Sequence, residues 1–265
     1  MNKYSLDFGT ETNKKLDDFY LSHQALIVNF ALKCKNNGFS CLKFQNDLMR
    51  LAVCLEYLKY TKVEYDRLGI DEKIFFDTIK DIEIWCSNNN NKGLKNYNWI
   101  KNHLKCELFK IGRLQYQIYR CNNATLNYQK LPFSFGDNLI YVHIPQGEKL
   151  NYDDCVASLS MAKSFFSKHF PEFSYKYFFS ESWLLYSKNN EFMDEDCNII
   201  KFQSVFVNHY DFLYDGQAIE RVFGKRRLFV KNYPHNSSLQ KRLKAYMLNG
   251  GKAGIGVASI DIDTI

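Results

Sequence analysis

Two titratable side chains stand where predicted strands end. His143 lies near the end of a predicted strand over residues 139–144, and Glu181 directly follows a predicted strand over residues 175–180. A histidine can take up a proton near neutral pH, and a partly desolvated carboxylate has the raised pKa that suits a general base. We therefore take both as candidate acid–base groups, with a histidine hydrogen-bonded inside its own strand as the structural alternative.

Other kinds of active site lack their sequence signatures. There is no Gly-x-Ser-x-Gly elbow, and the eight cysteines are scattered without a Cys-x-x-Cys pair or a Cys/His cluster at zinc spacing. We expect reduced, mostly buried thiols and no metal. The stretch GKAGIG at 251–256 follows a predicted helix and opens a strand, the reverse of the order that a phosphate loop needs, so it predicts a turn.

The first hundred residues have helical patterns. Apolar residues recur at spacings of three and four, Gly38 is placed to end one helix, and Asp71 is placed to cap another. The predicted helices cover approximately residues 14–35, 44–60, 71–85 and 98–109. An asparagine-rich breaker at 87–93 precedes the last of them.

From Gly112 onward, strands alternate with helices. Predicted strands cover about 113–120, 139–144, 175–180, 199–207 and 254–260, and predicted helices cover 152–169, 183–188 and a segment that Ser237 and Gln240 open with a capping box. The sequence thus predicts an α+β fold. A helical N-terminal domain, residues 1–105, precedes a mixed β-sheet flanked by helices, residues 106–265.

Composition limits the partners that we expect. The formal charge of +6 comes from 35 basic and 29 acidic side chains, and the basic residues are spread out except at 224–227. Nucleic-acid binders concentrate such charge, so we expect no nucleic-acid partner, whereas a small anion would suffice. No apolar run reaches the ~20 residues of a membrane helix and the first residues form no secretory signal, which predicts a cytoplasmic protein without a membrane partner. The oligomeric state is not predicted.

Four ordered stretches in the region 110–210 carry a family resemblance. They are Gly112-Arg113-Leu114-Gln115-Tyr116, His143-Ile144-Pro145-Gln146-Gly147 with Leu150, Ser182-Trp183-Leu184-Leu185, and Asn198-Ile199-Ile200 with Phe202 and Phe206. In these stretches the chain resembles the GNAT-like acyltransferases, which have a helical N-terminal domain and a GNAT-like C-terminal domain. The resemblance implies a partly splayed mixed sheet, acyl-coenzyme A as cosubstrate between two diverging strands, and a small amine or hydroxyl acceptor.

The resemblance also implies where the cosubstrate phosphates would bind. They would rest on backbone N–H groups in the turn before the helix at 152–169, where the helix dipole favours an anion. The implied cofactor-binding residues are Ile144, Gln146, Gly147 and Lys149. The turn departs from the usual Arg/Gln-x-x-Gly-x-Gly/Ala signature, and Asp153 and Asp154 in the first helical turn would repel a pyrophosphate, which Lys149 offsets in part.

Acyl transfer needs donors for the thioester carbonyl, a base for the acceptor and an acid for the departing thiolate. The places of Glu181 and His143 at strand ends make them the candidates for the base or a substrate contact, although family members more often carry a different residue at the place of Glu181. The resemblance implies the acid at Tyr186, shortly after the strand that Glu181 follows. Further implied substrate-binding residues are Gln115, Ser182, Trp183 and Gln203. Gln115 and Gln203, both on predicted strands, have the alternative of satisfying neighbouring backbone, and Trp183 that of packing between sheet and helix.

The sequence is also compatible with a second function on the same fold. The missing glycine signature favours a non-catalytic module whose cleft holds a ligand or a partner protein without turning it over. Binding of acyl-coenzyme A would separate the two, because the module without a phosphate loop has no site for it.

Overall fold

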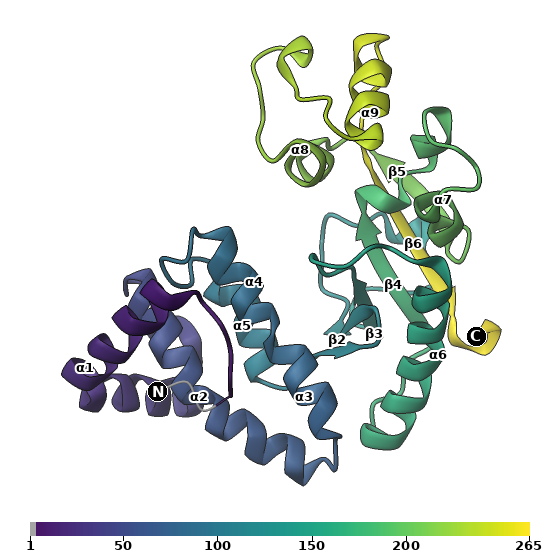
Figure 1. Ribbon diagram of the computed structural model, residues 1–265. Coiled ribbons are helices and arrows are strands. Elements are labelled where there is room, and N and C mark those ends of the chain that lie inside the picture. The colour runs from purple at the N-terminus through teal and green to yellow at the C-terminus, as the bar shows by residue number, and fades with distance from the viewer. Residues whose placement is uncertain (1–3) are drawn as a thin grey trace. The chain divides into compact units, whose positions relative to one another are not determined.

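Helices form the N-terminal part of the chain (Figure 1). The structure is a computed structural model that describes residues 4–265. These helices are α1 (Thr10–Asn37), α2 (Asp47–Arg67), α3 (Glu72–Ile79), α4 (Asp81–Asn88) and α5 (Tyr97–Leu104). Within the described part, no helix is long and apolar enough to cross a membrane.

Local capping chemistry sets the start of α3. Asp71 accepts a hydrogen bond from the backbone N–H of Lys73 at 2.7 Å, as predicted, and opens α3. The predicted helix over 71–85 is nevertheless two helices, with α3 ending at Ile79 and α4 beginning at Asp81. The helix predicted from residue 44 begins only at Asp47, and Phe44 lies outside it with 87% of its surface exposed.

The helix predicted over 98–109 is wrong in its second half. Helix α5 ends at Leu104, and strand β1 (Leu108–Ile111) follows. The backbone N–H of Lys110 donates to the hydroxyl of Thr78 at 2.9 Å, and β1 pairs antiparallel with the next strand. These tertiary bonds outweigh a weak local preference for helix.

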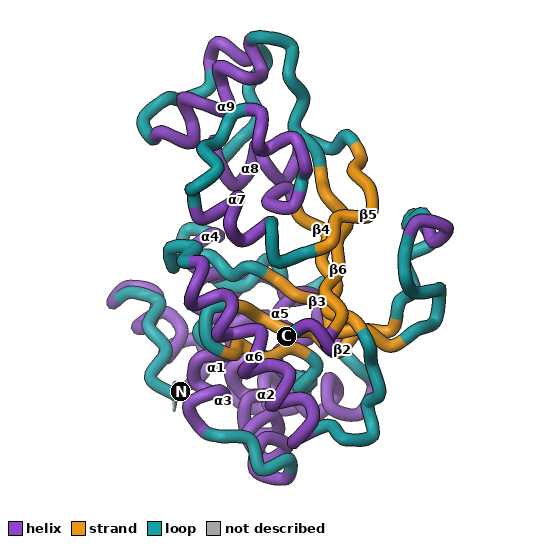
Figure 2. Tube along the Cα trace, turned by 90° about the vertical axis from the view of Figure 1, so that its right-hand side faces the viewer, coloured by secondary structure: helices purple, strands orange, loops and turns teal. Residues whose placement is uncertain are grey.

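Six strands make the mixed sheet of the C-terminal part, and its strands are orange in Figure 2. After β1 they are β2 (Leu114–Arg120), β3 (Asn138–His143), β4 (Tyr177–Ser182), β5 (Val207–Phe212) and β6 (Ile255–Asp261). Their order is β1-β2-β3-β4-β6-β5, with β3 and β4 parallel and β6 antiparallel to both β4 and β5. The sheet and its helices confirm the predicted α+β class.

The helices of this part are α6 (Tyr152–His169), α7 (Asn198–Gln203), α8 (Gly216–Phe223) and α9 (Ser238–Leu248). The capping box of Ser237 and Gln240 is present as predicted. The strand predicted over 199–207 is wrong, because most of it forms α7 and β5 begins only at Val207. The rings of Phe202 and Phe206 are in contact, with centroids 5.2 Å apart. Their spacing of four residues fits one face of a strand and one face of a helix equally well.

The helix predicted over 183–188 is instead a pair of short 3₁₀ segments, Trp183–Leu185 and Ser187–Glu191. Contacts group the described residues into two compact units. Unit 1 comprises the chain up to Gln117 with Ile144–Glu148 and Phe165–Phe170, and unit 2 comprises Ile118–His143, Lys149–Ser164 and Pro171–Ile265.

A glycine on β6 permits a close approach of backbone to the end of β4. Gly256 pairs with Ser182, and a Cβ atom at Gly256 would lie 1.9 Å from the carbonyl oxygen of Leu185. Neither backbone can withdraw easily, because both are buried.

We expect Gly256→Ala to lower the free energy of unfolding by about 1–3 kcal/mol, the usual effect of overpacking. Chemical denaturation measures this. Gly224→Ala is the control, because nothing lies within 4 Å of its added Cβ and its cost is only that of a positive φ. Equal losses in the two variants would contradict the steric explanation.

Candidate active site

Strands β3 and β4 are parallel, but few of their residues are paired. Within the described chain their register has two Cα pairs, Ile140 with Phe178 and Tyr141 with Phe179, whereas β4 and β6 share six. One residue further along, the hydroxyl of Ser180 donates to the carbonyl oxygen of Val142 at 2.9 Å. At the carboxyl ends of both strands, the Ser180 side chain therefore takes the place of the next backbone hydrogen bond between them.

Because β3 and β4 are parallel, His143 and Glu181 lie at the same end of neighbouring strands, beyond the last Cα pair. Side chains alternate along a strand, so residues 141 and 143 share a face, and the rings of Tyr141 and His143 stack with centroids 4.2 Å apart. Tyr141 pairs with Phe179, and Glu181 lies two residues after Phe179 on that same face. Two of the predicted acid–base residues therefore share one end of one face of the sheet.

Glu181 lies in a largely aromatic environment. Burial raises the pKa of its carboxyl above the usual value, and a hydrogen bond from the side-chain amide of Asn123, at 3.4 Å, opposes this shift. The same face holds a cluster of buried side chains with tyrosines packed against it. The cluster comprises Cys121, Leu126, Phe133, Leu139, Phe179 and Val257, with Tyr119, Tyr128, Tyr141 and Tyr210 among the tyrosines. A carboxyl with a raised pKa on such a surface is suited to accept a proton near neutral pH.

Tyr186 lies in a different environment from that of Glu181. It follows the first 3₁₀ segment, is 3% exposed, and lines a pocket of about 510 Å³ together with Lys188, Glu191, Leu213, Tyr246 and residues 249–252. Burial raises the pKa of its hydroxyl, with smaller contributions from Asp211 and Glu191, so the hydroxyl is protonated at neutral pH.

Three residues predicted to bind substrate hold the chain after β4 in place. The hydroxyl of Ser182 accepts from the backbone N–H of Leu184 at 3.2 Å, and Trp183 is buried. The prediction that Gln203 lies on a strand is wrong, because Gln203 is the last residue of α7. Its amide donates to the carbonyl of Tyr186 at 2.7 Å. These bonds fix the turn that carries Tyr186.

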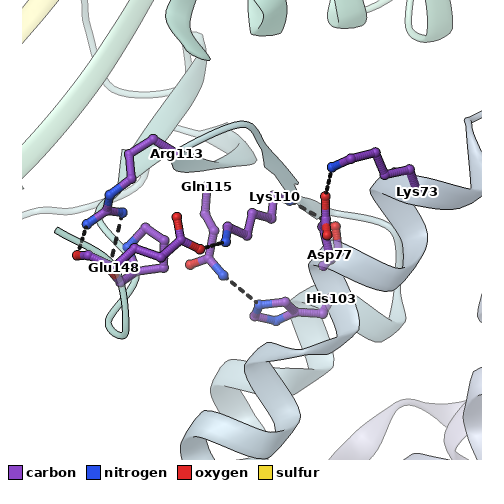
Figure 3. A network of polar contacts seen from close by, with 9 residues as sticks. Lys73, Asp77, His103, Lys110, Arg113, Gln115 and Glu148 are labelled. Carbon is purple, nitrogen blue, oxygen red and sulfur yellow. Dashed lines mark hydrogen bonds and ion pairs between the residues drawn. The ribbon is translucent and has the colours of Figure 1, made fainter. Parts of the chain in front are cut away.

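Gln115 lies on β2 as predicted and is buried in unit 1. Its amide nitrogen lies 3.5 Å from Nε2 of His103, and Figure 3 shows the two side chains facing each other. His103 is fully buried and also lies 3.0 Å from the carboxylate of Asp81. Burial of Asp81 is outweighed by hydrogen bonds from His103 and two tryptophans, which hold the pKa of Asp81 below its usual value.

The turn that follows β3, residues 144–148, is anchored within unit 1. The guanidinium of Arg113 donates to the carbonyls of Pro145 and Glu148, at 3.3 and 2.8 Å, and Lys110 pairs with the Glu148 carboxylate (Figure 3). Gly147 has φ of +96°. Within residues 4–265, the backbone N–H groups of Gln146, Gly147 and Glu148 have no hydrogen-bond acceptor.

The start of α6 is already capped by the chain itself. The side chain of Asn151 accepts from the backbone N–H of Asp153 at 3.1 Å, and Asp153 and Asp154 occupy the first turn. These side chains satisfy part of the first turn and place negative charge at the positive end of the helix dipole.

One pocket of unit 2 lies away from His143 and Glu181, neither of which lines it. It has a volume of about 770 Å³, and its lining includes Arg120, Asp137, Asn138 and Tyr177. Asn138 and Tyr177 are the first residues of β3 and β4, so this pocket lies at the amino ends of the parallel strands. It is therefore at the opposite end of these strands from His143 and Glu181.

Two family models match the sequence in chain order. An N-acyltransferase N-terminal domain matches residues 31–106, and a GNAT-like C-terminal domain matches residues 108–259. Because the second match alone covers more than half of the 265 residues, the chain belongs to the family of GNAT-like acyltransferases with these two domains. The curated proteins contain no significant match to this sequence.

Solved structures of an acyltransferase share the fold. The complex with decanoyl-CoA and teicoplanin has a TM-score of 0.70 at 21% identity, covering 81% of this chain and 66% of that chain. The complex with decanoyl-CoA has a TM-score of 0.70 at 22% identity, covering 80% of this chain and 65% of that one. This chain therefore spans just under two thirds of the length of these structures.

Sequence reasoning missed the residues that surround Glu181. Asn123 lies in a segment that resembles a polar linker, and nothing in its local pattern shows that it bonds Glu181, 58 positions away. His209 was missed as well, and its Nε2 lies 2.8 Å from the hydroxyl of Ser259. His209 lies at a register irregularity between β5 and β6, and such a bulge has no local sequence signal here.

The raised pKa of Glu181 has a consequence for stability. The folded state holds this proton more strongly than the unfolded state, so the ionised carboxylate destabilises the fold as pH rises through the window between the unfolded and the raised folded pKa. We expect Glu181→Gln to melt at a higher temperature than the native chain at pH 8, with the difference vanishing well below the ordinary pKa of about 4.3. Thermal denaturation across pH measures this.

The exposed Glu172, replaced in the same way, is the matched control and should leave the melting temperature unchanged at every pH. A Glu181→Gln protein that is no more stable at pH 8 than the native chain would contradict the burial of an unfavourable charge.

Proposed function

We propose that this chain is an acyl-CoA-dependent acyltransferase that transfers an acyl group to a small amine or hydroxyl acceptor. The observation that carries the proposal is the parting of β3 and β4 at the end where His143 and Glu181 share a face. Family membership supports it, as do the solved complexes of an acyltransferase with decanoyl-CoA on the same fold.

Glu181 is the proposed general base. Its pKa is raised by burial, so the carboxylate that is present near neutral pH gains more from taking up a proton than an exposed one would. His143 is proposed to contact the acceptor or to relay its proton. Acyl-CoA supplies the activated thioester carbonyl, and the residues of this chain orient the acceptor and receive its proton.

Tyr186 is proposed as the acid for the departing thiolate. Its hydroxyl is protonated at neutral pH, and the pocket of about 510 Å³ beside it provides room for part of a ligand. Ser182, Trp183 and Gln203 would act there by fixing the turn that holds Tyr186, and Gln115 is proposed as a further substrate contact.

The turn after β3 is the proposed site for the cosubstrate phosphates. Arg113 engages the carbonyls of Pro145 and Glu148, and Gly147 has a positive φ, which together favour a turn with amides directed away from those carbonyls. Ile144, Gln146, Gly147 and Lys149 would make the contacts. The boundary of the two domains is proposed at residues 105/106, which is supported by the family matches to 31–106 and 108–259.

We expect the protein to bind acyl-CoA in a thermal-shift assay with a panel from acetyl-CoA to decanoyl-CoA. A ligand at a hundred times its Kd adds about 2.7 kcal/mol to the apparent stability. The free fatty acids of the same lengths are the control. If no member of the panel raises the melting temperature, the chain is instead a non-catalytic binding module.

We expect Glu181→Gln to lower kcat/KM by about 10²–10⁴-fold, because the variant cannot accept a proton, and Tyr186→Phe and His143→Ala to lower it by smaller factors. Steady-state kinetics with the best acyl-CoA measures this. Glu172→Gln, an exposed change of the same type, should keep full activity. Unchanged turnover in all three site variants would reject these roles.

A further inference from the structure

The segment between β2 and β3 is a closed loop on the face of the sheet that bears Glu181. Its ends are joined by hydrogen bonds from Cys121 N–H to the carbonyl of Asp137, at 2.8 Å, and from Gly136 N–H to the carbonyl of Cys121, at 2.6 Å. Leu126 and Phe133 of the loop are buried in the same cluster as Phe179 and Val257. The segment that resembles a linker in sequence is thus packed in place.

Asn123 is the most constrained residue of this loop. Its side-chain oxygen accepts from the backbone N–H and the hydroxyl of Thr125, at 3.0 and 2.7 Å. Its carbonyl accepts from the backbone N–H of Leu126 at 3.2 Å and from the hydroxyl of Tyr128 at 2.8 Å. Because Thr125 occupies the amide oxygen, the amide NH₂ is the group directed at Oε1 of Glu181, 3.4 Å away.

Tyrosines from the neighbouring elements hold the rest of the loop. The hydroxyl of Tyr119 on β2 donates to the side chain of Asn122 at 3.2 Å, and the hydroxyl of Tyr210 on β5 accepts from the backbone N–H of Asn127 at 2.9 Å. The residues on either side of the Asn123 turn are therefore held by two strands, and Asn123 itself is held by the bonds of its own turn.

The titratable groups around Glu181 come from β2, β3, β5 and the loop, whereas its partner on β6 is the apolar Val257. They are Tyr119 on β2, Tyr141 and His143 on β3, Tyr210 on β5, and Cys121 and Tyr128 in the loop. Burial raises the pKa of each of the tyrosines and of Cys121, so these groups are neutral where Glu181 titrates. Burial disfavours the charge of Glu181, and the hydrogen bond from Asn123 favours it. The lysine of the loop, Lys130, has its Nζ 6.0 Å from the ring centroid of Tyr210.

We propose that Asn123 is a positioning residue of this site, whose amide holds Oε1 of Glu181 and leaves Oε2 to take the proton of the acceptor. The inference rests on the proposed function of Glu181 as base. In the step that it serves, the acceptor proton moves to Oε2 while the acceptor lone pair forms the new bond to the acyl carbon. The carbon–sulfur bond then breaks, and the thiolate is protonated.

The first experiment measures the titration of Glu181 directly. In protein labelled with ¹³C at the glutamate carboxyls, the resonance lost in Glu181→Gln is assigned and followed with pH. Asn123→Ala should move its midpoint to higher pH, because the hydrogen bond favours the charged form, and Asn123→Asp should move it further by adding a like charge. Thr125→Val, which removes one bond to the amide oxygen, should move it less.

The second experiment measures kcat/KM against pH with acyl-CoA. Asn123→Ala should displace the acidic limb upward and lower kcat/KM at pH 7 by about tenfold, the effect of a lost hydrogen bond to a charged group. Asn127→Ala, in the same loop with an exposed side chain, is the control and should match the native profile.

The titration of Glu181 and the pH profile of kcat/KM together distinguish a failure of the role of Asn123 from a failure of the proposed role of Glu181 as base. An unchanged midpoint of Glu181 in both Asn123→Ala and Thr125→Val, with native melting temperatures, overturns the role of Asn123. A displaced midpoint in a native protein that shows no acyl transfer supports the bond between the two side chains and rejects Glu181 as a catalytic base. If Asn123→Ala does not fold, Thr125→Val and Asn123→Ser give the same comparison with a smaller change.

Discussion

The incomplete pairing of β3 and β4 is the constraint on which the candidate site depends. Two parallel strands that stayed in register to their ends would satisfy each other's backbone and leave no opening between them. Here the Ser180 hydroxyl bonds the Val142 carbonyl just beyond the last Cα pair. Beyond this point the strands carry His143 and Glu181, while β4 stays paired with β6 over its whole length, from Tyr177 to Ser182.

The face that Glu181 occupies explains its unusual ionisation. Phe179 and Val257 beneath it and the tyrosines around it provide a surface of low polarity, where a charge is costly. Glu181 is half-buried on this surface, where an apolar side chain would be more stable. A carboxylate retained there lowers stability and gains a pKa suited to proton transfer, a compromise that is common where function and stability compete.

The loop over this face shows how an irregular segment can be as well fixed as a strand. Its closed ends and buried Leu126 and Phe133 provide the anchoring, and tyrosine hydroxyls from β2 and β5 add hydrogen bonds. Fixed loops on rigid sheets are where binding and catalytic groups concentrate. Asn123 belongs to this pattern, because every polar group of its side chain has a partner.

Local patterns in the sequence determined the helical first part, the strands β2, β3, β4 and β6, helix α6 and the capping box before α9. Each of these has a strong period or a specific cap that works through neighbouring residues. They were also sufficient to place His143 and Glu181 at strand ends. The stretch 199–207 failed because Phe202 and Phe206 fit both periods, and 98–109 failed because β1 is stabilised by its partner strand and Thr78.

The tertiary structure alone decided what surrounds the site. The bond between Asn123 and Glu181, the β-bulge at His209 and the shared face of His143 and Glu181 join residues that are far apart in the chain. Such contacts follow from strand order and register, which short-range periodicity does not contain. Local patterns therefore predicted most of the elements and two of the chemical groups, and the pairing of strands set their environment.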